Sequence, residues 1–358
     1  MLLKAVYRNS QNNSQRSLRL TSYLLALTLL LVVGTRSSWS QSFPNFSAPV
    51  IPNSSIVVDA GVSSASVPNG LFGNVLMSVF SSGGRLAYNI STDGVTTADT
   101  QIVPSAGFGI ACQSGNPANC GATVRVFNGT IYVAFASSTG ADLAVATATP
   151  ILGAPTYNWS IVDLDSSVSL RATPEMEVIN GLLVIVFPTI GNPPFANAFY
   201  TVTFDGSTFQ PANNTFLGGS SLQVSSNSKP AMAVLTVGTT PTLFMCTQQN
   251  GGLSNHRLFV YNTTDGIHWN FVEEFPQLSI GSNASMVNYN GTLVLANQQN
   301  SPNHLFIFMS PDGVSWTAQE YTNILIGGGP AIALFNGGLG LSFKSANSTN
   351  FFNGFASN

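Results

Sequence analysis

The sequence predicts an all-β fold made of repeated four-stranded sheets. Two recurring dipeptides predict it, because Asn-Gly occurs at 69–70, 128–129, 180–181, 290–291 and 336–337, and Asp-Gly occurs between those copies at 93–94, 205–206, 265–266 and 312–313. Both dipeptides favour the tight hairpin turn whose two central residues need positive φ. The steps between these five Asn-Gly copies are 59, 52, 110 and 46 residues. The step of 110 holds two units of 55, with the missing turn near Val237-Gly238, so a unit of roughly 50 residues repeats, as in propellers and solenoid arrays.

Each repeat reads as a meander of four short strands. The first two strands flank Asn-Gly, and they read ATVRVFNGTIYVAF, PEMEVINGLLVIVF, ASMVNYNGTLVLA and PAIALFNGGLGLSF. The last two flank Asp-Gly, and they read LAYNISTDGVTT, FYTVTFDGSTF, LFVYNTTDGIHW and LFIFMSPDGVSW. Val, Ile, Phe and Tyr dominate these runs, and no helical period is sustained after the N-terminal forty residues. The chain is therefore expected to be all-β.

Counting first strands gives six units, which start near Ser64, Ala122, Pro174, Ala231, Ala284 and Ala331. Only 21 residues follow Gly337, so the last unit lacks a strand. The segment Ser55–Gly61 precedes the first unit and reads as a lone strand that can complete the last sheet. Closing the ring removes exposed sheet edges. We predict a β-propeller of six four-stranded blades closed by this N-terminal strand, with a solenoid of stacked hairpins as the alternative.

The first forty residues differ from the rest and predict a secretory signal. Basic residues at 4, 8, 16 and 19 precede an apolar run from Tyr23 to Val33, and Ser38-Trp39-Ser40 supplies the small residues that favour cleavage before Gln41. An uncleaved anchor is the alternative, although the run is short for a membrane span. We assign residues 1–40 to a signal peptide, 41–54 to a linker and 55–358 to the propeller. No second apolar stretch of membrane length follows, so we expect an extracellular or periplasmic protein.

Charge is sparse and, after the expected cleavage, acidic. Five of the 11 Lys and Arg residues precede Gln41, which leaves six against 14 acidic residues and a net charge of 6 − 14, or −8. This balance argues against nucleic acid and anionic membranes as partners. A glycan or an extracellular protein is the expected partner.

The three cysteines fall into two kinds. Cys112 and Cys120 enclose the loop CQSGNPANC, whose short span favours a local disulfide in an oxidising compartment. Cys246 lies in the apolar run TLFMC and is expected to be a buried, inert thiol.

The Asp-Gly segments resemble the Asp box of sialidase-like β-propellers. The fullest match is Ser310-Pro-Asp312-Gly313-Val-Ser-Trp316, and weaker copies occur at 262–269 and 91–94. The family box usually has one more residue between its Asp and Gly, so these turns are similar to a shortened relative. In that family the carboxylate caps its own turn and the aromatic residue packs between blades. The resemblance therefore implies architecture, without implying an activity.

Sialidase activity also requires an arginine cluster that grips a carboxylate, a tyrosine paired with a glutamate, and an aspartate acid. The arginines after the signal are Arg85, Arg125, Arg171 and Arg257. Arg85 and Arg257 occupy equivalent places at the start of a third strand, which indicates a scaffold role. The arginine-isoleucine-proline element found early in many sialidases is absent.

One pair of charges is expected near the axis. Arg125 and Glu177 align at the same first-strand position, where the other units carry Ser66, Ala233, Val287 and Ala333. First strands line the central channel of a propeller, so the two side chains are predicted to form an ion pair. The functional alternative makes Glu177, Glu175 and Asp59 the acid/base carboxylates of a glycosidase. Glu175 and Glu177 share one strand face.

Two polar loops form a second candidate site. They are Gln248-Gln249-Asn250 before His256, and Gln298-Gln299-Asn300 before His304. Amides and imidazole near Trp269 and Trp316 could hydrogen-bond sugar hydroxyls and stack on pyranose faces. The alternative is that the amides satisfy loop backbone and the tryptophans pack between blades.

No cofactor or metal is expected. The two loop histidines have no nearby cysteine or carboxylate, so no transition-metal site is predicted. Asp163 and Asp165 could contact calcium, but a solvated strand end is the favoured interpretation. Phosphate-cradling glycine loops, nucleophile elbows and metalloprotease motifs are absent.

Two functions follow from these features. The favoured one is a secreted, non-catalytic β-propeller that binds glycans or another extracellular partner through rim loops, with Arg125 as a further ligand-binding candidate. The alternative is a sialidase-like glycoside hydrolase with axial carboxylates.

Overall fold

A computed structural model describes residues 42–47, 57–59, 61–103, 108–110, 121–138, 142–190, 199–213, 229–248, 257–279, 283–298, 303–347 and 350–357. The chain divides into two units, Met1–Phe43 and Pro44–Asn358, and the strands described below all lie in the second. The predicted signal peptide and the predicted Cys112–Cys120 disulfide lie outside the described residues.

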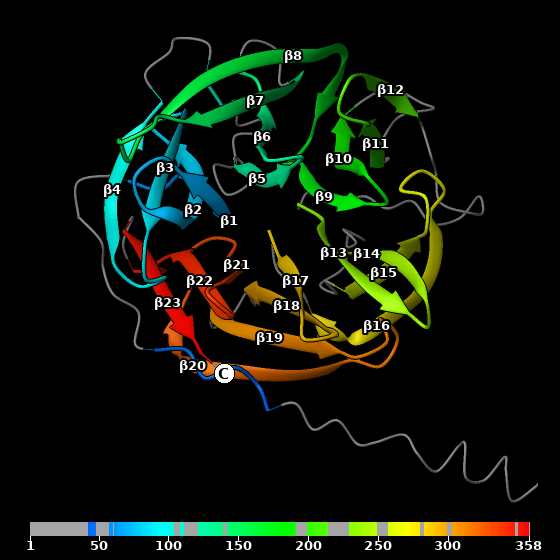
Figure 1. The fold of residues 1–358 in the computed structure, drawn as a ribbon. Coiled ribbons are helices and arrows are strands. Elements are labelled where there is room, and N and C mark those ends of the chain that lie inside the picture. Colours follow the sequence, from blue (N-terminus) through cyan, green and yellow to red (C-terminus); the bar gives the residue numbers. More distant parts are fainter. Residues whose placement is uncertain are drawn as a thin grey trace, which may run out of the picture. The chain divides into compact units, whose positions relative to one another are not determined.

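Strands are the only long regular elements in the described part, and within each sheet successive strands pair antiparallel in chain order (Figure 1). Sheet I comprises β1 (Ser63–Asn69), β2 (Gly73–Ser82), β3 (Arg85–Ser91) and β4 (Thr97–Ile102). Sheet II comprises β5 (Ala122–Phe127), β6 (Thr130–Ala136), β7 (Asp142–Pro150) and β8 (Tyr157–Leu170). Sheet III comprises β9 (Glu175–Ile179), β10 (Leu182–Ile190), β11 (Phe199–Phe204) and β12 (Phe209–Asn213).

Three further sheets follow. Sheet IV comprises β13 (Ala231–Val237), β14 (Thr240–Gln248), β15 (Arg257–Thr263) and β16 (Asn270–Ser279). Sheet V comprises β17 (Ser285–Tyr289), β18 (Thr292–Gln298), β19 (His304–Ser310) and β20 (Thr317–Leu325). Sheet VI comprises β21 (Ala331–Phe335), β22 (Gly338–Lys344) and β23 (Phe351–Ala356). A short pairing between the ends of β8 and β10 also links sheets II and III.

The first strand of each sheet is the innermost one. Figure 1 shows β1, β5, β9, β13, β17 and β21 directed toward the centre, with later strands farther out. Each of these strands contacts the first strand of the next sheet, and β21 contacts β1. The unit is a β-propeller.

The Asn-Gly turns have the predicted conformation at four positions. Asn128 and Gly129 both have positive φ, 49° and 77°, and the same pairing occurs at 180–181, 290–291 and 336–337. Positive φ at both central residues defines the type I′ turn that matches strand twist. The first copy differs, because the side-chain oxygen of Asn69 accepts the N–H groups of Leu71 and Phe72 and the positive φ falls on Gly73.

The Asp-Gly turns differ from the predicted type I′ geometry, because only the glycine has positive φ. In the fifth sheet, Asp312 Oδ1 accepts the N–H groups of Val314 at 2.8 Å and Ser315 at 2.6 Å. The same two contacts recur at Asp93, Asp205 and Asp265. Each carboxylate therefore caps its own turn, as the resemblance to the Asp box implied.

Apolar side chains fill the spaces between neighbouring sheets. Met77 and Val124 belong to the layer between sheets I and II, and Leu235 and Leu293 to the layer between sheets IV and V. Cys246 is fully buried in that second layer, and burial raises the pKa of its thiol. The prediction of a buried Cys246 is confirmed.

The layer between sheets VI and I contains polar groups as well. Ser78 Oγ lies 2.7 Å from Ser64 Oγ and 3.1 Å from Ser342 Oγ, and Ser342 Oγ donates to Asn353 Oδ1 at 2.8 Å. All four side chains are buried. Two small apolar clusters also lie in this layer.

The segment that meets the open edge of β23 differs from the one predicted. Within Ser55–Gly61, residues 57–59 form no strand, and the N–H of Asp59 donates to the carbonyl of Ser81 in β2. On β23, the carbonyl of Phe355 accepts the Ser47 N–H at 2.9 Å, and the Phe355 N–H donates to Ser47 Oγ at 3.1 Å. Among the described residues, the one that hydrogen-bonds this edge is therefore Ser47, which lies upstream of the predicted closing strand.

Candidate binding site on the propeller axis

A cavity of about 330 Å³ lies among the first strands, and every one of the six sheets contributes lining residues. Most of the lining is small or apolar, as at Ala65, Val126 and Val287. Within the described part of the chain, two charged side chains line it, Arg125 of β5 and Glu177 of β9. First strands therefore line a central cavity, as the repeat alignment predicted.

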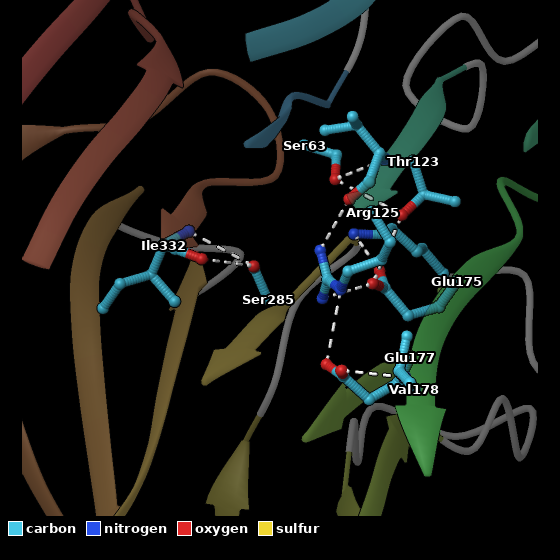
Figure 2. Close-up of polar contacts among 10 residues, drawn as sticks. Ser63, Thr123, Arg125, Glu175, Glu177, Val178, Ser285 and Ile332 are labelled. Carbon is cyan, nitrogen blue, oxygen red and sulfur yellow. Dashed lines mark hydrogen bonds and ion pairs between the residues drawn. The ribbon is translucent and has the colours of Figure 1, made fainter. Parts of the chain in front are cut away.

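Arg125 binds two carboxylates from the neighbouring sheet (Figure 2). Its Nε donates to Glu177 Oε2 at 3.3 Å, and its Nη2 donates to Glu175 Oε1 at 2.9 Å. Its Nη1 donates to the carbonyl of Val124 at 2.9 Å. The predicted ion pair between Arg125 and Glu177 is confirmed, and Glu175 is a second partner.

Glu175 lies deeper than Glu177 and has a second cation. Its side chain is 2% exposed, and its Oε2 pairs with Nζ of Lys229, which lies two residues before β13. Thr123 Oγ1 also donates to Glu175 Oε1 at 3.3 Å. Lys229 was not predicted from the sequence, because it falls outside the aligned strands. The sequence feature that could have indicated Lys229 is its position just before a first strand, which lines the axis.

The cluster contains two cations and two carboxylates, and burial acts on the pKa values of Glu177, Lys229 and Arg125. Burial raises the pKa of Glu177, and Arg125 only partly opposes this effect. Burial lowers the pKa of Lys229 despite its pairing with Glu175. For Arg125 burial acts to lower the pKa, but attraction to Glu177 and Glu175 outweighs it and the pKa is raised. Arg125 is therefore a permanent cation held by two acids.

The side chains at the cavity differ in exposure. On β9 the side chain of Glu175 is 2% exposed and that of Glu177, which lines the cavity, is 20% exposed. On β21, Ala333 and Leu334 both line the cavity, and they are 3% and 46% exposed. Glu177 and Leu334 are therefore open to a ligand.

Asp59, the third predicted carboxylate, is placed elsewhere. Its Oδ2 accepts hydrogen bonds from Ser81 Oγ and from the N–H of Gly84, both at 2.9 Å, at the turn that joins β2 and β3. It does not line the cavity. Of the three carboxylates predicted from the sequence, only Glu177 faces the cavity.

The described amides of the two rim loops are held within the scaffold. Gln248 is buried at the end of β14, and Gln298 Nε2 donates to Asn303 Oδ1 at 3.2 Å. The remaining predicted loop residues lie outside the described part of the chain, namely Gln249, Asn250, His256, Gln299 and Asn300.

The two tryptophans lie at the opposite ends of the sheets from these loops. Trp269 is buried, and its Nε1 donates to Thr201 Oγ1 at 3.2 Å. Trp316 packs on the apolar layer between sheets IV and V, and its Nε1 donates to the carbonyl of Gly313. Both follow Asp-Gly turns, whereas the polar loops join the second and third strands. Because antiparallel strands reverse direction at each turn, these two kinds of connection fall on opposite rims.

His304 has a structural partner on the outermost strand of its sheet. It pairs with Glu320, just as Arg257 pairs with Glu274 in the preceding sheet. The strand registers match. Phe259, two residues after Arg257, is opposite Glu274, and Phe306, two residues after His304, is opposite Glu320. His304 is thus the equivalent of Arg257, one residue away from the His256 with which the sequence alignment matched it.

Comparisons with known proteins identify the architecture. No known protein family and no curated protein matches the sequence. AofleA from Arthrobotrys oligospora has a similar structure, with 13% identity, coverage of 89% of this chain and 88% of that chain, and a TM-score of 0.63. A mutant of the α-L-arabinofuranosidase arb93a from Fusarium graminearum, in complex with an iminosugar inhibitor, has 11% identity, coverage of 87% and 98%, and a TM-score of 0.60.

The Hadza microbial sialidase Hz136 shares 14% identity over 82% of this chain and 64% of its own, with a TM-score of 0.55. At these identities the likeness concerns the fold. The protein therefore shares the β-propeller fold with these three proteins.

Neither a membrane-spanning helix nor a metal cluster occurs in the described part of the chain. No helix there is long and apolar enough to cross a membrane. No group of three or more His, Cys, Asp or Glu side chains among the described residues is arranged to hold a metal ion.

Proposed function

We propose that the protein is a secreted, non-catalytic β-propeller of six blades that binds a glycan in its axial cavity. The contacts among the six first strands and the bonds between Ser47 and Phe355 support a closed ring. The N-terminal sequence up to Ser40 supports secretion.

The observation that carries this proposal is that, among the described residues, a single carboxylate faces the cavity. Glycoside hydrolysis by the usual route needs two carboxylates on either side of the scissile bond. Glu177 faces the cavity, but Glu175 is 2% exposed between Arg125 and Lys229, and Asp59 bonds to a turn of sheet I. This arrangement favours binding over hydrolysis.

The size and lining of the cavity favour a sugar residue as the ligand. A volume of about 330 Å³ is near the lower end of the range of roughly 300–1,000 Å³ for ligand pockets. Apolar walls with a few polar groups are typical of such sites. Arg125 donates and Glu177 accepts hydrogen bonds, which suits hydroxyl groups. The complex of arb93a with an iminosugar gives further support for a sugar-sized ligand.

A matched pair of variants tests the location of the site. Leu334 lines the cavity and is 46% exposed, whereas Leu152 is 94% exposed and is not a cavity residue. Leu334→Trp is expected to fill the cavity and to weaken glycan binding at least tenfold, about 1.4 kcal/mol. Leu152→Trp is expected to bind like the wild type. The measurement is a glycan array with the chain beginning at Gln41, followed by calorimetric titration. Full binding by Leu334→Trp would exclude the cavity as the site.

The alternative function is a glycoside hydrolase that uses Glu177. It is favoured by one observation, because burial raises the pKa of Glu177, as a general acid requires. A panel of fluorogenic glycosides decides between the two functions. Turnover by the wild type that is lost in Glu177→Gln would establish the hydrolase and overturn the non-catalytic proposal. No turnover together with glycan binding is the expected result.

A further inference from the structure

Each of the three guanidinium nitrogens of Arg125 already donates a hydrogen bond. Nε donates to Glu177, Nη2 donates to Glu175, and Nη1 donates to the carbonyl of Val124. Three of the five N–H groups are therefore in use, and two carboxylates already compensate the positive charge. A ligand carboxylate would find no unpaired charge at Arg125.

The neighbouring cation is equally unable to meet an anion. Lys229 is 3% exposed, and its ammonium group pairs with the buried Glu175. The charged group most accessible from the cavity is Glu177, whose side chain is 20% exposed. Its Oε2 binds Arg125 and its Oε1 accepts the Val178 N–H at 2.9 Å. Among the residues that the structure describes, a ligand entering the cavity thus meets a carboxylate and no uncompensated positive charge.

Two unfavourable terms oppose the binding of an acidic ligand in this cavity. Its carboxylate would lose water without gaining a cation of its own. It would also approach the like charge of Glu177, and like charges brought together at an interface disfavour binding. A neutral sugar avoids both terms, because its hydroxyl groups can donate to Glu177 and accept from the remaining N–H groups of Arg125.

We infer that the axial cavity discriminates by charge: it accepts uncharged sugar residues and excludes sugars that carry a carboxylate. This inference rests on the proposed function, which places a glycan in the cavity. Charge selection sets this site apart from a site built around an arginine cluster that grips an acidic sugar. The balanced set Arg125, Lys229, Glu175 and Glu177 carries the selection.

The first test uses pairs of glycosides that differ only at C6. Immobilised glucosides and galactosides are compared with the matching glucuronides and galacturonides, and sialosides are included as a second acidic class. The neutral members are expected to bind, and the acidic members at least tenfold more weakly. Equal or tighter binding of an acidic member, lost in Leu334→Trp, would overturn the inference and leave glycan binding in the cavity intact.

The second test changes the charge of the cavity. Glu177→Gln preserves an acceptor for the Val178 N–H but leaves one positive charge uncompensated near the axis. The preference for neutral over acidic members is expected to shrink at least tenfold. The control is Asp205→Asn, which removes the same charge from an exposed turn and touches no cavity residue. An unchanged preference in Glu177→Gln, or an equal change in Asp205→Asn, would refute the inference.

Outcomes of the two proposals can be told apart. A wild-type chain that binds no member of any pair ends both proposals. Binding that persists in Leu334→Trp removes the cavity as the site. If Glu177→Gln fails to fold, the wild-type comparison of neutral and acidic members still decides the question of charge.

Discussion

At the scale of single residues, hydrogen bonds at the Asp-Gly turns hold the aspartates in their charged form. Asp205 is the most exposed example. Its carboxylate accepts the N–H groups of Thr208 and Ser207 and the hydroxyl of Ser207, and these bonds lower its pKa to about 2. Because the unfolded chain has no such bonds, the pKa rises toward the ordinary value of 3.8 on unfolding.

This lowered pKa predicts that the folded state becomes less stable as the pH falls. The folded state binds fewer protons than the unfolded state between pH 3.8 and about 2. The stability contribution is therefore fully present above pH 3.8 and is lost as the pH falls through about 2. The melting temperature of the wild type is expected to fall over this interval, and that of Asp205→Asn to fall less. Parallel curves for the two proteins would contradict this interpretation.

Residues of the axial cluster could be predicted only where they lie in the repeat. Arg125 and Glu177 were found because both occupy the same position of an aligned first strand. Lys229 precedes its strand, so no alignment of strands could include it. The alignment of sheet I was one residue off. Ala65 is opposite Met77, which packs toward sheet II. The equivalent of Arg125 in sheet I is therefore Ala65, where the alignment had placed Ser66. Strand alternation makes such an error change the face on which a side chain lies.

At the scale of elements, the Asp-Gly turn of sheet V is pressed against its neighbour. Gly313 has φ of +76°, and a Cβ atom there would lie 2.1 Å from Cε1 of Phe244 in sheet IV. A side chain would meet both backbone strain and an aromatic ring with little room to move. Gly291, in an Asn-Gly turn, has a similar φ of +78°, but no atom lies within 4 Å of the position that a Cβ would take there.

The two glycines provide a matched comparison. Gly313→Ala is expected to lower the free energy of unfolding by about 2–4 kcal/mol, the sum of strain and overpacking. Gly291→Ala is expected to cost about 1 kcal/mol, because strain alone applies. Urea unfolding of both variants measures the difference. Equal losses would show that Phe244 moves aside without cost.

The positions of the hairpins were predicted more successfully than the turn conformations or the rim on which each loop lies. Dipeptide spacing located nearly every hairpin, because Asn-Gly and Asp-Gly act within a few residues of chain. The Asp-Gly conformation was predicted incorrectly, since the capping contacts of Asp312 replace the type I′ geometry. The tryptophans and the polar loops were placed together although they lie on opposite rims. The direction of strand pairing decides on which rim a connection lies, and the composition of a loop carries no information about that direction.

At the scale of the whole molecule, the layer between sheets VI and I is distinctive. Ser342 and Asn353 are opposite one another in register there. The same register pair in sheet II is Ala134 and Val145. Asn353 Nδ2 is buried and has no hydrogen-bond partner among the described residues. An unpaired buried donor costs roughly 1–3 kcal/mol, so this layer is not optimised for stability.

Replacing the polar pair of sheet VI by the apolar pair of sheet II, and the reverse, tests whether the polar layer reduces stability. The double variant Ser342→Ala with Asn353→Val is expected to raise the free energy of unfolding by about 1 kcal/mol, because it removes the unpaired amide. The reverse exchange, Ala134→Ser with Val145→Asn, is expected to lower it by about 2 kcal/mol or more. Chemical denaturation measures both. Destabilisation by the first exchange would show that the polar layer holds the two sheets together.

The segment at the edge of the last sheet could not be found from sequence alone. Ser55–Gly61 was chosen for its apolar pattern. The residue that hydrogen-bonds Phe355 is Ser47, through its backbone N–H and its side-chain hydroxyl, and Ser47 lies in a stretch without strand periodicity. Contacts between residues 308 positions apart leave no local signal.

Glycan binding on the axis is tested most directly by a crystal structure of the mature chain soaked with its tightest-binding neutral glycoside. We predict one sugar residue in the axial cavity, hydrogen-bonded to Glu177 and Arg125, with its glycosidic bond intact. A sugar bound only at a rim, or a cleaved product beside Glu177, would contradict the proposal.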